Sequence, residues 1–302
     1  MTGHGTPRGL FFMRENKYLL ALFYVGLPIL PLLIFWFIPL FVSLWLSTTD
    51  WDYINPVIQS VGMENYTTIL GSSEFIAAFG NTVFFTLWTV IPTLILGFFA
   101  ALLIHSISKG KTLFKTLLFS PWVTPTVAIS IVWSWIFEPK VGVINQILGF
   151  LHLPQPSWLQ SSNFAMWAII IVTIWKGIGW CMIFYCDALQ KIPSEIEEVC
   201  EIEGVSYWKK MKRVYSPYVS PTTLFLIITS IISSLQAYDQ IQVMTQGGPS
   251  GSTRTLLYYY YQLAFEQFNM GQATALAVLL IFITALISLA QFLLSKYWVH
   301  YN

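Results

Sequence analysis

Long stretches without a charged residue are the feature that most limits how this chain can fold. Six such apolar stretches occur, the fourth interrupted once by Lys176, and each has about the 20 residues that a helix needs to cross a membrane. A barrel strand needs only about 10 residues, so these stretches predict helices. We therefore expect an all-α membrane protein with six transmembrane helices, over 19–46, 82–108, 117–137, 164–185, 214–238 and 267–295.

Composition supports this class and excludes several others. Hydrophobic residues make up 56% of the chain and charged residues only 10%, against about 25% in a soluble globular protein. Too few polar groups are present to cover a water-facing surface, which excludes a cytosolic enzyme and a disordered chain. The 15 basic and 14 acidic side chains nearly balance, so the chain lacks the basic excess of a protein that binds nucleic acid.

The distribution of lysine and arginine predicts the orientation, because cytoplasmic loops of membrane proteins are enriched in these residues. Twelve of them fall in the N-terminal tail, the second and fourth connections and the end of the last helix. Only Lys140 and Arg254 fall on the opposite side, and Lys176 lies within the membrane. We expect both termini in the cytoplasm, with 1–18 as a tail and 19–46 as a first anchor helix.

No motif supports catalysis or metal binding. Gly110-Lys111-Thr112 ends like a phosphate-binding loop, but His105 occupies the position of the required first glycine and a membrane helix precedes the motif. The four histidines lie far apart without metal-ligand spacing, and no Ser/His/Asp group converges. We therefore expect no catalytic residue, no metal site and no cofactor on this chain.

The most informative segment is the predicted cytoplasmic connection 188–217. Ser194 and Glu197 have the S-x-x-E spacing of a capping box, and Gly204 can end a helix in the left-handed conformation. We expect a helix of about nine residues between them, about 13 Å long. Its apolar and acidic residues separate onto opposite faces, Ile196, Val199 and Cys200 on one and Glu197, Glu198 and Glu201 on the other.

A basic run at 209–213 follows this helix. The residues alone leave two interpretations open. The segment is either a helix that docks onto a partner protein, or a solvated loop whose basic patch lies beside the membrane surface.

A spaced motif in this connection resembles a known family. Glu198-Val199-Cys200-x3-Gly204, then nine residues, then Val214-x-Ser216-Pro217, is similar to the EAA loop of permeases in binding-protein-dependent ABC importers, Glu-Ala-Ala-x3-Gly-x9-Ile-x-Leu-Pro. The glutamate, glycine and proline match at the family's spacing, and Ser216 is the largest departure. The resemblance implies a coupling helix that docks in a cleft of an ATPase subunit, with five coupling residues, Glu197, Glu198, Glu201, Gly204 and Pro217.

A second motif narrows the resemblance. The segment from Tyr238 to Pro249, with Thr255 and the run 261–265 after it, resembles the external loop of the carbohydrate-uptake branch of these importers. Within that branch it is similar to the maltose/glycerol-phosphate type and to the first of the two paired permeases. The resemblance covers about 75–295, which implies a type I ABC importer permease core there, and a loop facing the binding protein at Gly247, Gly248 and Pro249.

The resemblance also implies where a sugar would pass. In maltose-type permeases the residues that line the membrane site fall on helices that correspond to the third, fourth and fifth here. Positional matching, anchored on Pro121-x3-Pro125, the EAA loop and Gly-Gly-Pro, points to nine residues, Trp122, Thr126, Thr173, Lys176, Gly177, Trp180, Ser230, Ser233 and Ser234. Tryptophan rings can stack on sugars and hydroxyl side chains can bind sugar hydroxyls, although small hydroxyl residues also pack membrane helices together.

Lys176 is the most unusual of these residues, because an ionisable group in a membrane helix is costly unless it faces a cavity or a partner. One interpretation is a structural lysine that pairs with a neighbouring carboxylate or extends to the membrane surface. The other is contact with substrate, which would favour an acidic sugar such as a uronic-acid oligosaccharide over a neutral oligosaccharide or a glycerol-phosphate-type substrate.

The family resemblance implies an assembly in a bacterial cytoplasmic (inner) membrane. The expected partners are a second homologous permease, two ABC ATPase subunits that hold ATP and Mg, a periplasmic or extracellular solute-binding protein, and membrane lipid. Two other classes fit less well. An ion-coupled secondary transporter needs carboxylates inside its helices, and all 14 acidic residues lie in loops or at helix ends. A membrane-embedded lipid-modifying enzyme needs converging polar residues at one interface, and none is evident.

Overall fold

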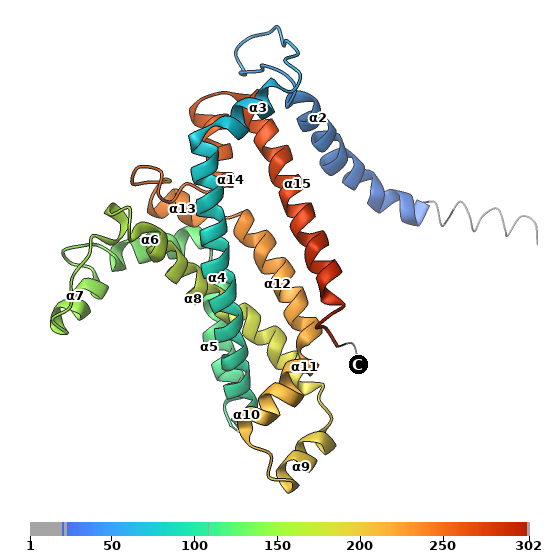
Figure 1. Cartoon of the computed structure of the whole chain (residues 1–302), viewed down its shortest axis with the longest axis vertical. Coiled ribbons are helices and arrows are strands. Elements are labelled where there is room, and N and C mark those ends of the chain that lie inside the picture. Colours follow the sequence, from blue (N-terminus) through green and yellow to red (C-terminus); the bar gives the residue numbers. More distant parts are fainter. Residues whose placement is uncertain (1–19, 21–22, 108, 301–302) are drawn as a thin grey trace, which may run out of the picture.

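Four long helices dominate the computed structural model, which describes residues 20, 23–107 and 109–300 (Figure 1). Each is long and apolar enough to cross a membrane. They are Phe23–Leu46, which contains the π-helical turn η1 (Leu33–Phe37) and α2 (Ile38–Leu46), α4 (Ser73–Ser106), α8 (Ala165–Gln190) and α15 (Met270–Ser295). The predicted tail 1–18 lies outside the described residues.

The predicted third and fifth helices are each broken into two pieces, which corrects the expectation of continuous spans. α5 (Lys111–Val123) and α6 (Thr126–Ile136) meet at 95°, and the segment Tyr207–Tyr218 meets α12 (Ser220–Leu235) at 67°. Counted as one span each, these pairs bring the total to the predicted six.

Proline explains both breaks. Thr124 precedes Pro125 and is extended, with ψ at 137°, as proline requires of the residue before it. At the second break Pro221 has no N–H to donate to the carbonyl of Pro217, and the hydroxyl of Ser220 donates to that carbonyl instead, at 2.7 Å.

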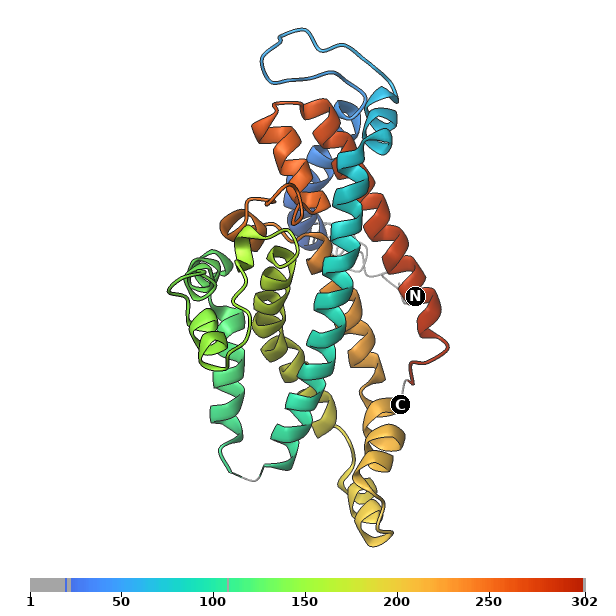
Figure 2. The same ribbon diagram turned by 60° about the vertical axis from the view of Figure 1, so that its left-hand side comes forward.

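Shorter helices lie at the two ends of the molecule and along one of its sides, where α7 and α13 are found (Figure 1). α3 (Glu64–Gly71) and the connection 47–63 form one end, the α3 end, and α9 and α10 form the other, the α9 end (Figures 1 and 2). The remaining short elements are α7 (Val143–Phe150), η2 (Trp158–Gln160), α9 (Ser194–Ile202), α10 (Tyr207–Lys210), η3 (Met211–Tyr215), α11 (Ser216–Tyr218), α13 (Asp239–Met244), α14 (Leu256–Tyr261) and η4 (Gln262–Glu266).

Close packing of α8 against its neighbours forms the centre of the molecule. Gly179 in α8 lies so near α5 that a Cβ atom would be 2.0 Å from the backbone oxygen of Leu118. On another side of α8, a Cβ atom at Gly97 of α4 would lie 2.5 Å from Cβ of Cys181. Small residues therefore allow three helices to meet at short distances around one region of the structure.

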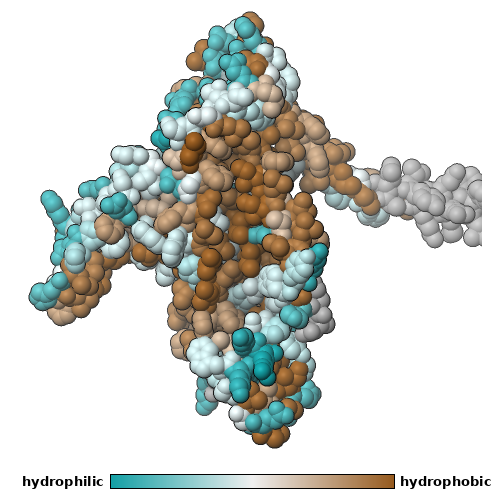
Figure 3. Space-filling model, viewed as in Figure 1, coloured by the Kyte–Doolittle hydropathy of each residue, from teal (hydrophilic) through white to brown (hydrophobic). Residues whose placement is uncertain are grey.

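The outer surface of the bundle is apolar. Space-filling colours show a hydrophobic middle with hydrophilic residues gathered toward both ends (Figure 3). Ile91 and Phe282, near the middle of α4 and α15, are examples of exposed apolar side chains. The helix Phe23–Leu46 is the extreme case, because none of its most apolar stretch is buried. Such surfaces fit lipid rather than water.

Candidate functional site

A cavity of about 470 Å³ lies among six helices in the centre of the molecule. This volume is in the range of about 300–1,000 Å³ typical of small-molecule sites. All nine residues that the sequence predicted for the substrate pathway line this cavity: Trp122, Thr126, Thr173, Lys176, Gly177, Trp180, Ser230, Ser233 and Ser234. Helical periodicity explains the grouping, since positions 172, 173, 176, 177, 180 and 181 share one face of α8.

Lys176 is held by the break between α5 and α6. Its Nζ donates a hydrogen bond to the backbone oxygen of Trp122 at 3.0 Å, and lies 5.1 Å from the centroid of the Trp122 ring. That oxygen belongs to the last turn of α5, where carbonyls lack helical partners. Within the described chain, Lys176 has no carboxylate within 4.0 Å, so the interpretation of a lysine paired with a carboxylate does not describe this structure.

Trp122 and Trp180 form the aromatic wall of the cavity. Their rings stack at 4.9 Å between centroids with an interplanar angle of 22°, and Phe184 packs its ring edge-to-face with Trp180 at 4.6 Å. The two tryptophans therefore cover one another, rather than both presenting an open face to a sugar. In this arrangement they also tie α5 to α8.

Hydroxyl groups supply most of the remaining polar lining. Thr173 donates to the carbonyl of Ile169 at 2.8 Å, and Ser234 donates to that of Ser230 at 2.9 Å. A hydroxyl has one donor and two acceptor lone pairs, so these groups retain acceptor capacity after bonding their own helices. The polar part of the lining can thus accept hydrogen bonds, while Lys176 contributes the cationic donor.

The sequence analysis missed the contribution of α4, which lines the cavity with Phe85, Thr89, Val90 and Thr93. A signal for it was present. Threonines recur at 82, 86, 89 and 93, the spacing of one helical face, and all four are buried. Thr229 of α12 and Gln240 of α13 are further lining residues that were not predicted.

The loop helix α9 has the predicted length, but the predicted capping box is wrong. Ser194 is the first helical residue rather than the cap, and no side chain caps this end. Glu197 instead turns toward the rest of the chain, where its carboxylate contacts His105 and Tyr215. The C-terminal end fits the prediction, since Gly204 follows the helix with φ at +62°.

The two faces of α9 also differ from the prediction. Ile196 packs against the buried cluster of the bundle, whereas Val199 is 51% exposed and Ile202 is 86% exposed. Glu198 and Glu201 are exposed as well. α9 therefore presents a mixed apolar and acidic surface outward, and Glu197 is separate from the other two predicted glutamates. The fifth residue of the predicted coupling set, Pro217, lies in α11.

The predicted external loop is compact and attached to α4. Gly247 has φ at +74°, and a Cβ atom there would lie 2.5 Å from the Tyr258 ring. Gly248 and Pro249 follow it, with the hydroxyl of Thr253 donating to the Gly248 carbonyl at 2.8 Å. Asn81 of α4 donates to two carbonyls beyond the loop's tip, those of Gly251 and Arg254, at 2.9 and 3.0 Å. The loop with Gly247 to Pro249 thus lies beside α4 and follows α13, away from α9 (Figure 1).

Comparison with known proteins decides the family. Residues 93–298 match the family described as "Binding-protein-dependent transport system inner membrane component". The chain belongs to this family. The multiple sugar-binding transport system permease protein MsmF of Streptococcus mutans is 31% identical over 93% of this chain and 96% of the relative. The sn-glycerol-3-phosphate transport system permease protein UgpA of Escherichia coli is 27% identical over 98% of this chain and 99% of the relative.

The fold of this inner-membrane component is that of solved ABC importers. A bacterial ABC transporter involved in the import of the acidic polysaccharide alginate contains a chain with a TM-score of 0.81. It is 22% identical and the alignment covers 95% of this chain and 98% of that one. These likenesses confirm the predicted all-α importer-permease fold.

Family membership settles the general role. The chain is a multi-pass permease component of a carbohydrate-type ABC importer in the inner, cytoplasmic membrane, as the sequence motifs indicated. It acts as a permease and not as an enzyme, because the matched family and relatives are transport components. Binding-protein-dependent transport does not use the ion-coupled mechanism of a secondary transporter. Within 23–107 and 109–300, no three His, Cys, Asp or Glu side chains come together as metal ligands.

Proposed function

We propose that this permease imports an oligosaccharide through the central cavity, as one of two homologous permeases in a complex with two ABC ATPase subunits. ATP and Mg are bound by the ATPases, and a periplasmic or extracellular solute-binding protein delivers the sugar. The observation that carries this proposal is the cavity, because family membership supplies the transport role and nine positions matched to a sugar pathway converge on one site.

The two ends of the molecule are assigned by charge. The connections at the α9 end include the basic run 209–213, whereas the connection 47–63 at the α3 end contains no lysine or arginine. The positive-inside rule places α9 and both termini in the cytoplasm. Gly247 to Pro249 then lie on the outer side, where the binding protein docks.

The exposed face of α9 is the ATPase contact in this proposal. Val199 and Ile202 project apolar groups outward beside Glu198 and Glu201, which fits a cleft on a partner better than water. ATP-driven closure of the ATPases would move α9 and open the pathway outward. Glu198→Lys, or a bulky residue at Gly204, is expected to uncouple ATP hydrolysis from uptake while the chain remains in the membrane.

Purification in mild detergent from the native cell tests the assembly. We expect the tagged chain, one homologous permease and an ATPase to be recovered in a ratio of about 1:1:2, because the proposed complex has two permeases and two ATPase subunits. A chain recovered alone and stable, or normal coupled uptake in Glu198→Lys, would refute the assignment.

For the substrate we propose an acidic sugar, such as a uronic-acid oligosaccharide. Lys176 is half-buried in the cavity wall and its charge is met by a carbonyl dipole and an aromatic ring, not by a carboxylate. Asp239 of α13 acts on this charge only from more than 4.0 Å away, so an anionic group on the substrate would supply an opposite charge in direct contact. The solved alginate importer, whose substrate is an acidic polysaccharide, is an example of this fold acting on such a cargo.

Lys176→Met tests this preference, with Lys140→Met as the control because Lys140 is exposed between α6 and α7. The expected result is a loss of acidic-oligosaccharide uptake of about tenfold or more at Lys176, from the loss of one charge-assisted contact, with less effect on neutral oligosaccharides. Equal effects on both sugars would favour a neutral oligosaccharide. Stimulation of the ATPase by glycerol phosphate alone would favour a glycerol-phosphate-type substrate.

A further inference from the structure

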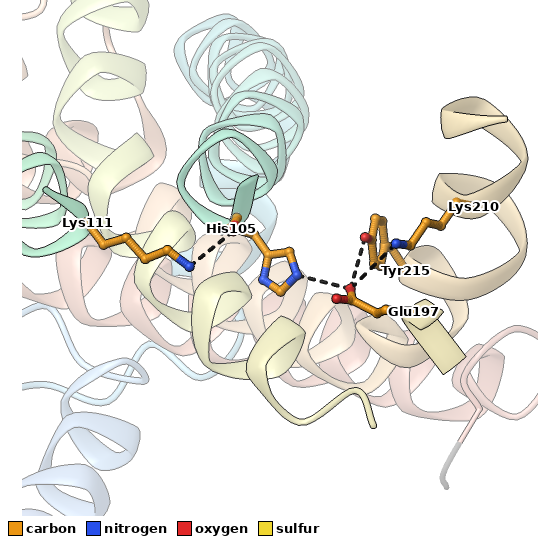
Figure 4. Close-up of polar contacts among 5 residues, drawn as sticks. All are labelled: His105, Lys111, Glu197, Lys210 and Tyr215. Carbon is orange, nitrogen blue, oxygen red and sulfur yellow. Dashed lines mark hydrogen bonds and ion pairs between the residues drawn. The ribbon is translucent and has the colours of Figure 1, made fainter. Parts of the chain in front are cut away.

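One carboxylate joins several elements at the α9 end. Oε1 of Glu197 in α9 accepts a hydrogen bond from the Tyr215 hydroxyl at 3.0 Å and contacts Nε2 of His105 at 3.1 Å, and Nζ of Lys210 lies 3.9 Å away (Figure 4). We call these four residues the Glu197 cluster. They come from the last turn of α4, from α9, from α10 and from η3.

Contacts around the cluster extend it further. The rings of His105 and Tyr215 pack edge-to-face at 5.9 Å, and Nζ of Lys210 lies 5.4 Å from the Tyr215 ring centroid. Lys111, the first residue of α5, donates from Nζ to the backbone oxygen of His105 at 3.1 Å. The end of α4 is therefore tied both to the start of α5 and, through Glu197, to the loop that carries α9.

α9 has few other attachments to the rest of the chain. None of its residues is buried, and Ile196 is its apolar contact with the core of the bundle. The Glu197 side chain is only 28% exposed, in contrast to the exposed Glu195, Glu198 and Glu201 on the same helix. The cluster is thus the main polar connection between α9 and the membrane-spanning part.

α4 leads directly from this connection to the cavity. His105 and the cavity residue Thr93 are in the same uninterrupted helix, about 18 Å apart along its axis. Pro92 lies just before Thr93, so no proline interrupts α4 between Thr93 and His105. Each turn of this part is hydrogen-bonded to the next, and an axial or tilting displacement of its end is therefore transmitted along it. A movement of α9 that pulls on His105 therefore reaches the cavity wall.

We propose that Glu197 is a positioning residue that fastens α9 to the end of α4, so that displacement of α9 by an ATPase moves the α4 wall of the cavity. This inference rests on the proposed function, because that proposal supplies the ATPase that moves α9. It assigns Glu197 to the internal side of the loop, while Glu198 and Glu201 face the partner.

The charge of Glu197 suits this role. Burial raises the pKa of its carboxyl, but the hydrogen bonds from His105 and Tyr215 and the charge of Lys210 outweigh burial and hold the pKa below its usual range. The carboxylate thus stays ionised at neutral pH, and hydrogen bonds to an ionised acceptor are stronger than those to a neutral one.

Transport stoichiometry is the first test. The complete importer, with Glu197→Ala, Glu197→Gln or the control Asp187→Ala in this chain, is reconstituted in liposomes with the loaded binding protein; Asp187 is an exposed carboxylate near the end of α8 and lies outside α9. We expect the ratio of sugar imported to ATP hydrolysed to fall about tenfold in Glu197→Ala, less in Glu197→Gln, which keeps an acceptor oxygen, and not at all in Asp187→Ala. An unchanged ratio in Glu197→Ala overturns the proposal.

A distance measurement in detergent, on this chain with whatever subunits co-purify with it, separates the fastening from the wider function. Spin labels at Ser106→Cys and Glu203→Cys, both exposed, report the separation of α9 from the end of α4 in a Cys200→Ser background. We expect one narrow distance distribution, which broadens in Glu197→Ala and in His105→Ala, with no further broadening in the double variant. An equally narrow distribution in Glu197→Ala overturns the proposal even if the importer assembles as proposed. If the distribution broadens in Glu197→Ala but the importer does not assemble with its proposed partners, only the proposed function is refuted.

Discussion

Gly179 offers a sharp test of how closely α5 and α8 approach each other. A Cβ atom there would lie 2.0 Å from the backbone oxygen of Leu118 and 2.7 Å from its carbonyl carbon. Ordinary contact begins at 3.4 Å, so Gly179→Ala requires a separation of about 1.4 Å in a region that is already filled. Both atoms of Leu118 belong to the main chain, and therefore no side-chain rotation relieves the clash.

The expected cost follows from this geometry. Overpacking of a filled interior costs about 1–3 kcal/mol. Replacing a helical glycine by alanine returns about 0.5–1 kcal/mol through the gain in helix propensity. Because the clash is with the main chain, we take the upper end of that cost and expect a net loss of stability of about 2–2.5 kcal/mol, after allowing for the gain. The separation also moves Trp122, one turn beyond Leu118, away from Trp180, which follows Gly179, so uptake should fall as well.

Two other glycines provide matched controls. Gly80 of α4 has no atom within 4 Å of its Cβ position, and the three nearest atoms to that of Gly177 in α8 all belong to the Thr93 side chain, whose methyl group is nearest at 2.9 Å. The assay is the temperature at which the detergent-solubilised protein loses its monodisperse elution peak. This temperature should be equal to or above that of the parent in Gly80→Ala, slightly below it in Gly177→Ala, and lowest in Gly179→Ala. Equal stability of Gly179→Ala and Gly80→Ala would refute the close approach.

Three further predictions concern polar side chains. Asn145 is buried, donates to the carbonyls of Pro139 and Pro156 and accepts from Trp158, so Asn145→Ala should cost about 1–3 kcal/mol and open the connection 138–158 to limited proteolysis. Asn65→Ala leaves two carbonyls of the first connection without their donor, and thermal stability should fall, whereas Asn55→Ala, at an exposed site, should not change it. The pKa of Glu197 is lowered in the folded protein, so its contacts should stabilise the protein fully above about pH 4.5 and be lost as the pH falls through the folded pKa. The difference in melting temperature between the parent and Glu197→Gln should therefore shrink on acidification.

The sequence predicted the membrane-spanning segments well because hydrophobicity over about 20 residues decides membrane insertion. It did not predict the bends at Thr124–Pro125 and near Val219, although the prolines were visible. Proline disfavours a continuous helix without fixing the angle, which depends on how the two pieces pack. α4 also begins at Ser73, nine residues before its apolar stretch, since a helix can continue beyond the membrane.

Prediction of the site depended on two different kinds of information. The nine pathway residues came from positional similarity, and the structure brings them together around one cavity. The contact between His105 and Glu197 was not predicted, because the two are 92 residues apart and no local pattern joins them. The same contact explains the failed capping box, since a carboxylate bound to His105 and Tyr215 is no longer free to reach back to its own helix end.

The hydrogen bond from Lys176 to the backbone oxygen of Trp122 has a consequence for evolution. A main-chain acceptor is present whatever side chain position 122 carries. The ring at this position can therefore be exchanged for another side chain while the anchor of the lysine is retained. Selection can therefore change the shape of this wall of the cavity while the main-chain hydrogen bond of its cation is kept.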